Sequence, residues 1–132
     1  MNNHKNIMDE DCPFCKIGEH VEVLFKTDTA MAILDSYPIS PGHTLVIPKR
    51  HVPDYFELTV EEQNELWQLV NRCKIILQDR FHPDGFNIGI NVGEMAGQSI
   101  FHVHIHLIPR YKGDMKNPKG GVRHILPGKG YY

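Results

Sequence analysis

The sequence has no apolar run long enough to span a membrane, and its first residues lack the apolar stretch of a secretion signal. It also has no excess of basic charge, because 14 Lys and Arg are set against 16 Asp and Glu, for a formal net charge of −2. Electrostatic capture of nucleic acid usually requires a basic face. We therefore expect a soluble, cytoplasmic protein that binds neither membranes nor nucleic acid.

Cysteine is also scarce, since three residues are too few, and odd in number, for a disulfide scaffold. The sequence shows no internal repeat, low-complexity tract or linker, and 132 residues fit one compact domain. We expect a single domain over residues 1–132. Within it, residues 1–20 form an N-terminal segment around the cysteine pair, and residues 111–132 form an extended C-terminal tail.

The chain is expected to contain several short strands and one long helix. Thr59 and Glu62 have the spacing of a capping box, and apolar residues follow at helical intervals to about Arg80. Strands dominate the rest of the chain, which predicts an α+β fold with an antiparallel sheet. The β-leaning runs are residues 21–26, 30–34, 44–48, 86–92 and 100–110.

Histidine, in contrast, is abundant, with nine residues. His102, His104 and His106 alternate with Val103 and Ile105. In a strand, alternate side chains share one face at about 6.5–7 Å spacing, so the three imidazoles are expected to line one pocket. The alternatives are a solvated strand, whose wet face would more often carry Thr, Lys, Glu or Ser, and a plain three-histidine metal site.

The segment before these histidines favours phosphate chemistry. Gly97-Gln98-Ser99 offers an amide, a hydroxyl and exposed N–H groups at a bend, and such groups suit an anionic phosphate. Imidazole is a competent nucleophile toward phosphorus and, one position away, a proton donor to a leaving oxygen. The combination predicts phosphoryl-group chemistry that depends on positioning and charge stabilisation.

The pair Cys12-Pro13-Phe14-Cys15 has the spacing of a zinc knuckle. A redox dithiol is the alternative, but the pair precedes any βαβ pattern. A tetrahedral zinc needs two more ligands, and the candidates are His51 and His102. Cys73 lies in the apolar stripe of the predicted helix and is expected in the core.

Residues 98–108, QSIFHVHIHLI, resemble the signature of the histidine-triad (HIT) superfamily. Residues 41–49 look like the second conserved block of that family, and residues 87–91 with Gly97-Gln98 look like its third. The resemblance extends from about Cys12 to Arg110. It implies a HIT-like fold, in which an antiparallel sheet of about five strands carries one long helix.

The resemblance also implies roles for individual side chains. His104 would be the nucleophile that takes up the α-phosphate of a nucleotide. His106 and His43 would lie on the phosphate, while Gln98 and Ser99 would bind phosphate or leaving-group oxygens.

Two further residues complete the implied nucleotide site. Asp35 would bind the ribose hydroxyls and Asn91 would support the phosphate site, although simple turn capping is the alternative for both. By similarity to some bacterial members and to galactose-1-phosphate uridylyltransferases, a structural zinc is expected, with no organic cofactor. The implied zinc ligands are Cys12, Cys15, His51 and His102.

The expected function is a nucleotide hydrolase. It would cleave dinucleoside polyphosphates such as diadenosine tetraphosphate, or related adenylylated compounds, through a nucleotidyl-histidine. The alternatives are a nucleoside phosphoramidase, a non-catalytic nucleotide-binding signalling module, and a structural zinc protein, which would leave Gln98 and Ser99 unexplained. The expected partners are a purine nucleotide and a second copy of the chain, paired through a sheet edge and the helix that carries Trp67.

Overall fold

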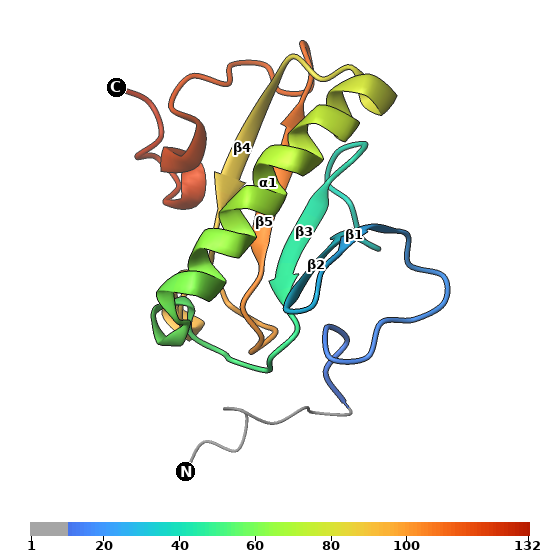
Figure 1. Ribbon diagram of the computed structural model, residues 1–132. Helices are drawn as coiled ribbons and strands as arrows, with labels where there is room; N and C mark the ends of the chain where they lie inside the picture. The colour runs from blue at the N-terminus through green and yellow to red at the C-terminus, as the bar shows by residue number, and fades with distance from the viewer. Residues whose placement is uncertain (1–10) are drawn as a thin grey trace.

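The computed structural model describes residues 11–132, in which five strands form one antiparallel sheet ordered β1-β2-β3-β5-β4. A single long helix, α1 (Val60–Phe81), crosses one face of this sheet (Figure 1). The predicted α+β fold with one long helix is confirmed. The strands are β1 (Val23–Lys26), β2 (Ala30–Leu34), β3 (Thr44–Pro48), β4 (Gly85–Gly89) and β5 (Ile105–Arg110), and the 3₁₀ turns are η1 (Tyr55–Glu57), η2 (Glu94–Ala96) and η3 (Gly121–Ile125).

The helix begins and ends at the signals that the sequence carries. The Thr59 hydroxyl accepts from the Glu62 N–H at 3.0 Å, and the Glu62 carboxylate accepts from the Thr59 N–H at 2.9 Å. This is the predicted capping box. The helix ends at Phe81, where His82 adopts a left-handed conformation with a φ of 54°. Within residues 11–132, no helix combines the length and the apolar character needed to cross a membrane.

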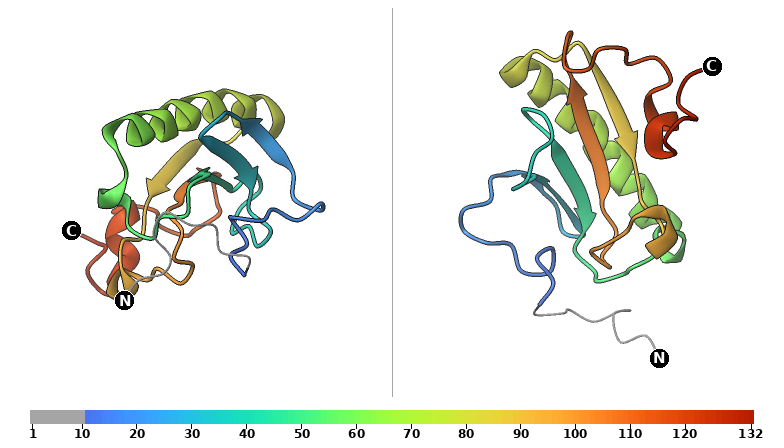
Figure 2. Two further views of the ribbon diagram at one scale, coloured as in Figure 1. Left: turned by 60° about the horizontal axis from the view of Figure 1, so that its bottom comes forward. Right: turned by 180° about the vertical axis from the view of Figure 1, so that it is seen from behind.

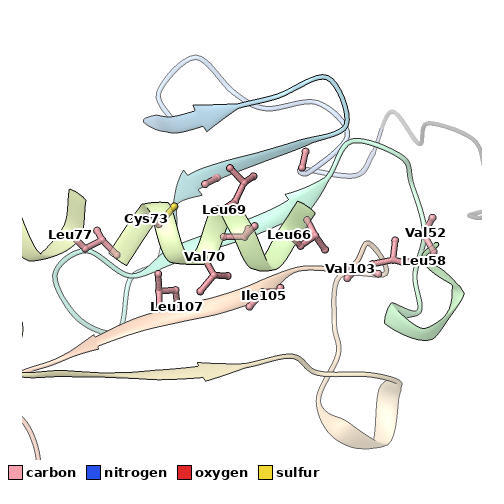
Figure 3. Packing of buried hydrophobic residues seen from close by; sticks show 13 residues of the cluster. Val52, Leu58, Leu66, Leu69, Val70, Cys73, Leu77, Val103, Ile105 and Leu107 are labelled. Carbon is pink, nitrogen blue, oxygen red and sulfur yellow. The ribbon is translucent and has the colours of Figure 1, made fainter. Parts of the chain in front are cut away.

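The main core lies between α1 and the sheet (Figure 3). Alternate strand residues such as Val46, Ile105 and Leu107 point toward α1, whose Leu66 and Leu77 are fully buried against them. Burial of each such side chain contributes about 1.5–3 kcal/mol to folding. Cys73 also lies in this core, as predicted, and burial raises the pKa of its thiol to about 12.

The opposite face of the sheet carries no α-helix among the described residues, as the view from behind shows (Figure 2). Ile33, Leu45 and Ile47 project from this face, and the N-terminal segment brings Cys12 and Phe14 against them in a second apolar cluster. The segment before β1 therefore reaches the face of the sheet on which His106 lies.

The strand predicted over residues 100–110 is shorter in the structure, because only Ile105–Arg110 pairs with neighbouring strands. The Val103 N–H donates instead to the Val52 carbonyl at 2.8 Å. His102 and His104 thus precede the strand, and the prediction that all three histidines lie in one strand is wrong. The strand predicted over residues 86–92 also ends early, at Gly89, and the first strand begins at Val23 instead of residue 21.

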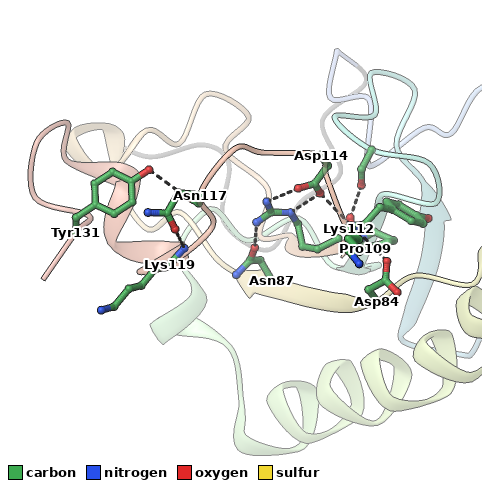
Figure 4. Close-up of polar contacts among 11 residues, drawn as sticks. Asp84, Asn87, Pro109, Lys112, Asp114, Asn117, Lys119 and Tyr131 are labelled. Atoms are coloured by element: carbon green, nitrogen blue, oxygen red, sulfur yellow. Dashed lines mark hydrogen bonds and ion pairs between the residues drawn. The ribbon is translucent and has the colours of Figure 1, made fainter.

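The C-terminal tail, residues 111–132, is not extended along its whole length. It contains η3 and returns to lie beside β4 (Figure 1). At its root, the Arg110 guanidinium donates to Asn87 at 2.6 Å and to both carboxylate oxygens of Asp114 at 2.8 Å (Figure 4). Further along, the Tyr131 hydroxyl donates to the Asn117 carbonyl at 3.0 Å. These bonds hold the tail to the sheet and to itself.

Candidate functional site

Two groups of ligand-type side chains gather among residues 11–132, and in each group the ligand atoms lie within 4.8 Å of one another. We name the first the cysteine cluster and the second the carboxylate cluster. His104 belongs to neither, but the centroid of its ring lies 4.9 Å from that of His106. The cysteine cluster contains Cys12, Cys15, His51 and His102, and the carboxylate cluster contains Asp35, His43 and His106.

The cysteine cluster has the dimensions of a tetrahedral zinc site. His102 Nδ1 lies 3.5 Å from the Sγ atoms of both Cys12 and Cys15, and 3.2 Å from His51 Nδ1. His51 Nδ1 lies 3.0 Å from Cys15 Sγ. Zinc bonds of about 2.3 Å to sulfur and 2.0–2.1 Å to nitrogen place tetrahedral ligand atoms roughly 3.3–3.8 Å apart. The four residues predicted as ligands are thus brought together at nearly the required spacing.

The protonation of His102 also suits a metal ligand. Its Nε2 lies 2.7 Å from the Pro48 carbonyl, and since a carbonyl can only accept, the ring proton is on Nε2. The lone pair is therefore on Nδ1, the atom that faces the thiols. Burial lowers the pKa of His102 to about 4, which keeps the ring neutral at pH 7. A backbone partner that orients a ligating imidazole in this way is typical of metal sites.

The carboxylate cluster is centred on His43, whose ring contacts His106, Asp35 and a backbone N–H. His43 Nε2 lies 3.0 Å from His106 Nδ1 and 3.5 Å from an Asp35 carboxylate oxygen. On the other side of the ring, His43 Nδ1 accepts from the Ile39 N–H at 3.2 Å. Burial lowers the pKa of His43, and it lowers the pKa of His106 to about 4, although Asp35 opposes both shifts. Both rings are therefore neutral at pH 7.

His104 is oriented by a backbone carbonyl. Its Nδ1 lies 2.8 Å from the His102 carbonyl, so Nδ1 carries the proton and Nε2 carries the lone pair. Burial lowers the pKa of His104, which leaves that lone pair unprotonated at pH 7. The Phe14 ring packs edge-on against His104 with centroids 5.0 Å apart and limits how the imidazole can turn.

His104 and His106 line a cavity of about 610 Å³, a size within the usual range for small-molecule sites. One part of the wall is apolar, and the other carries groups that can bind hydroxyls and phosphate. The apolar residues include Phe14, Ile17, Ile33 and Leu45, and the polar residues include Asp35, Asn91, Ser99, His104 and His106. The structure thus brings most of the predicted site residues into one wall.

Asp35 both caps a turn and lines the cavity. One carboxylate oxygen accepts from the Tyr37 N–H at 2.9 Å and so caps the turn. The other faces His43, and the residue also lines the cavity. Turn capping and a place in the ligand site are therefore compatible at this position.

Two predicted phosphate ligands lie outside the cavity wall. Gln98 is buried, and its amide donates to the carbonyls of Pro53 and Ile100 at 2.7 and 3.1 Å. Its side-chain oxygen accepts from the Gly93 N–H at 2.9 Å, so the whole amide is used to hold the loop. His43 is 4% exposed and lies behind His106. Neither Gln98 nor His43 is therefore among the residues that line this cavity.

The backbone groups that orient the histidines could not be identified from the sequence. The Pro48 carbonyl and the Ile39 N–H fix the rings of His102 and His43, but every residue carries a carbonyl and nearly every residue an N–H. The cavity wall also contains three residues that no sequence motif identifies, Lys16, His20 and Tyr37.

Curated relatives of this chain include nucleotide-cleaving enzymes. A bis(5'-adenosyl)-triphosphatase of Dictyostelium discoideum is 43% identical over 96 residues, which cover 73% of this chain and 64% of that protein. An asymmetrical bis(5'-nucleosyl)-tetraphosphatase of Schizosaccharomyces pombe is 38% identical over 81% of this chain and 59% of its own length. The chain thus spans less than two thirds of both relatives.

Solved structures of similar proteins share the fold. A HIT family protein from Bacillus anthracis superposes with a TM-score of 0.74 at 40% identity, covering 80% of this chain and 77% of that one. A zinc-bound histidine triad family protein from Mycobacterium smegmatis gives 0.73 at 34% identity, covering 81% and 80%. The sequence profile of the HIT domain matches residues 19–113. With this match, its fold and its histidine arrangement, the chain belongs to the HIT domain family.

Proposed function

We propose that this protein hydrolyses a nucleotide at its α-phosphate through a covalent nucleotidyl-histidine on His104. The observation that carries the proposal is the orientation of His104 in the cavity wall. The bond from Nδ1 to the His102 carbonyl leaves the lone pair on Nε2, and the cavity offers both apolar and polar walls. A buried, neutral imidazole of this kind is a competent nucleophile toward phosphorus.

The reaction has two displacement steps. First, the Nε2 lone pair of His104 forms a bond to phosphorus, and the bond from phosphorus to the leaving group breaks with its electron pair on the leaving atom. The leaving atom takes a proton from a donor in the cavity wall. Water then attacks phosphorus and returns a proton to the same donor, the P–N bond breaks with its pair returning to Nε2, and a nucleoside monophosphate is released.

The cavity wall supports a purine nucleotide as the substrate. A base would pack against Phe14, Ile17, Ile33 and Leu45, while Asp35 would accept hydrogen bonds from ribose hydroxyls. The α-phosphate would then lie near Ser99, Asn91 and His106, beside the nucleophile. Gln98 would act by holding the loop that presents Ser99.

We propose a phosphoric anhydride as the bond that is cleaved, as in dinucleoside polyphosphates. The names of two relatives, a triphosphatase and a tetraphosphatase, support this choice. A phosphoramidate would react by the same covalent route, so the experiment compares both substrate classes.

The test is mass spectrometry of the intact protein, quenched early after mixing with diadenosine polyphosphates or adenosine phosphoramidate. His104→Ala and His104→Gly are the test variants, and His82→Asn, at the exposed helix end, is the matched histidine control. We expect an adenylyl adduct on the native chain and on the control, and on neither His104 variant. Turnover that persists without His104 would contradict the proposal. The faster substrate identifies the bond.

We also propose that the cysteine cluster holds a structural zinc. Cys12, Cys15, His51 and His102 would supply all four ligands, so the bound metal would have no open position for substrate. Its contribution would be to tie the N-terminal segment to the segment that carries His104. The zinc-bound relative from Mycobacterium smegmatis supports this identity of the metal.

A homodimer remains part of the proposal. Val60 and Trp67, two turns apart on α1, are 65% and 37% exposed, which leaves apolar surface on the helix for a second copy. Sedimentation equilibrium would give the mass in solution, and a monomer at tens of micromolar would contradict this part.

A further inference from the structure

We infer that His43 is a positioning residue that acts through His106, fixing the proton of the His106 ring on Nε2, and does not itself bind the phosphate. The position of the proton is independent of any reaction. Its effect on turnover rests on the proposed function.

The backbone of Ile39 determines which ring nitrogen of His43 carries the proton. Its Nδ1 lies 3.2 Å from the backbone nitrogen of Ile39. A backbone N–H can only donate, so His43 Nδ1 must be the acceptor and carry a lone pair. A neutral imidazole has one ring proton, which in His43 is therefore on Nε2.

The proton on His43 Nε2 in turn determines which ring nitrogen of His106 carries a proton. The protonated Nε2 of His43 lies 3.0 Å from His106 Nδ1 and 3.5 Å from an Asp35 oxygen. His106 Nδ1 must therefore accept, and the single proton of a neutral His106 is placed on Nε2. The chain of donors runs from the Ile39 N–H through His43 to His106.

The proton on His106 Nε2 is the one that can face the cavity. His106 lines the cavity, whereas His43 is 4% exposed and is not part of the wall. His106 uses Nδ1 for His43, so Nε2–H is the group left to face a ligand. An N–H donor stabilises phosphate oxygens or a departing oxygen, while a lone pair at the same place would repel them.

The same geometry argues against a metal ion in the carboxylate cluster. A cation would need the lone pair of His43 on Nε2, which would put the ring proton on Nδ1. That proton would then point at the Ile39 N–H, 3.2 Å from the backbone nitrogen. The Ile39 amide thus selects a hydrogen-bonding role for His43 over a metal-binding role.

The experiment uses two variants of His43 in the full chain. His43→Gln keeps an N–H donor at the reach of Nε2, and His43→Leu removes the donor at similar volume. Long-range ¹H–¹⁵N correlation spectra of the resting protein report which ring nitrogen of His106 carries the proton. We expect an unprotonated Nδ1 and a protonated Nε2 in the native chain and in His43→Gln, and a mixture of tautomers in His43→Leu.

Kinetics give the second readout, with the better of the two substrate classes. Because His43 does not touch substrate, we expect His43→Leu to lower kcat by about 10²-fold with KM changed by less than about threefold, and His43→Gln to recover most of the loss. Equal losses in the two variants, or a rise in KM alone, would overturn the inference.

The two proposals can fail separately. A protonated His106 Nδ1 in the native chain would overturn the inference whatever the enzyme does. Absence of turnover with the expected proton position would instead contradict the proposed function.

Discussion

The cysteine cluster and the carboxylate cluster contain similar residues but are oriented by opposite backbone groups. In the cysteine cluster, the Pro48 carbonyl accepts a hydrogen bond from His102 Nε2, so the lone pair on His102 Nδ1 faces the thiols. In the carboxylate cluster, the Ile39 N–H takes the outer lone pair of His43 and leaves a proton facing inward. One cluster therefore presents lone pairs at its centre, whereas in the other a His43 proton faces the acceptors His106 Nδ1 and Asp35 and leaves the His106 proton for the cavity.

This difference shows that residue type alone does not decide what a histidine cluster binds. Lone pairs that converge at zinc distances favour a cation, whereas a protonated nitrogen beside a cavity favours an anion. The deciding group in each case is one backbone atom from a neighbouring loop or strand end. The following experiments can break or sharpen this distinction.

The largest effect is expected from removing the thiols of the cysteine cluster. Cys12→Ser with Cys15→Ser should abolish zinc retention and lower the free energy of unfolding by on the order of 5 kcal/mol, because binding energy at a structural metal is folding energy. Metal analysis and denaturant unfolding would measure both quantities. Cys73→Ala, in the core, is the matched control and should cost about 1 kcal/mol while zinc is retained. Full zinc content without the two thiols would contradict the assignment.

The second effect concerns metal stoichiometry. Zinc-free protein should take up one equivalent of Co²⁺ with the absorption of thiolate ligation, and binding at the carboxylate cluster should be weaker by at least about a thousandfold. A titration followed by absorption and by calorimetry would test this. Uptake of a second equivalent that is lost in His43→Leu would show that the carboxylate cluster is a metal site after all.

The third effect is a pH dependence of stability. The folded pKa values of His43 and His106 lie below the value of about 6.5 in unfolded chains, since burial disfavours the charged rings. Above pH 6.5 both states are neutral and stability is complete. As the pH falls from about 6.5 toward about 4, the unfolded chain gains protons first and stability is lost.

His106→Gln removes part of this dependence. In a background lacking Cys12 and Cys15, where zinc release cannot contribute, the variant should lose about 1–2 kcal/mol less than its parent between pH 6.5 and pH 5. Unfolding free energies across this range would measure the difference. Parallel curves would show that His106 is not held neutral by its surroundings.

The smallest effect should come from a site remote from both clusters. Thr59→Ala removes the capping box of α1 and should cost about 1 kcal/mol. Zinc content and the position of the His106 proton should not change, as measured by metal analysis and by the same ¹⁵N spectra. A change in either would mean that the clusters respond to stability in general.

The sequence predicted the fold well because its signals are local. The Thr59–Glu62 pair and the apolar periodicity mark α1, and the alternation from Val103 to Leu107 marks the side chains that pack beneath it. The alternation predicts a strand over residues 100–110, but the ladder begins only at Ile105, because a burial pattern persists even where the hydrogen bonds of a ladder stop.

The sequence predicts which residues form the site, but it does not predict how their imidazole rings and amide groups are oriented. The CxxC spacing and the resemblance to the HIT family together predict the members of the cysteine cluster, and the alternating histidines predict that His104 and His106 line one pocket. The buried amide of Gln98 and the position of His43 behind His106 depend on partners that lie far away in the sequence, Pro53 for Gln98 and His106 for His43. Backbone partners of this kind leave no mark in residue identity.

The span of the cysteine cluster also bears on how the protein is made. Cys12 and His102 are 90 positions apart, so the cluster cannot close until most of the chain has left the ribosome. The carbonyl that orients His104 belongs to the same His102. Closure of the cysteine cluster and orientation of the His104 ring would then both wait for the emergence of residues 102–104, so the two events would coincide during synthesis.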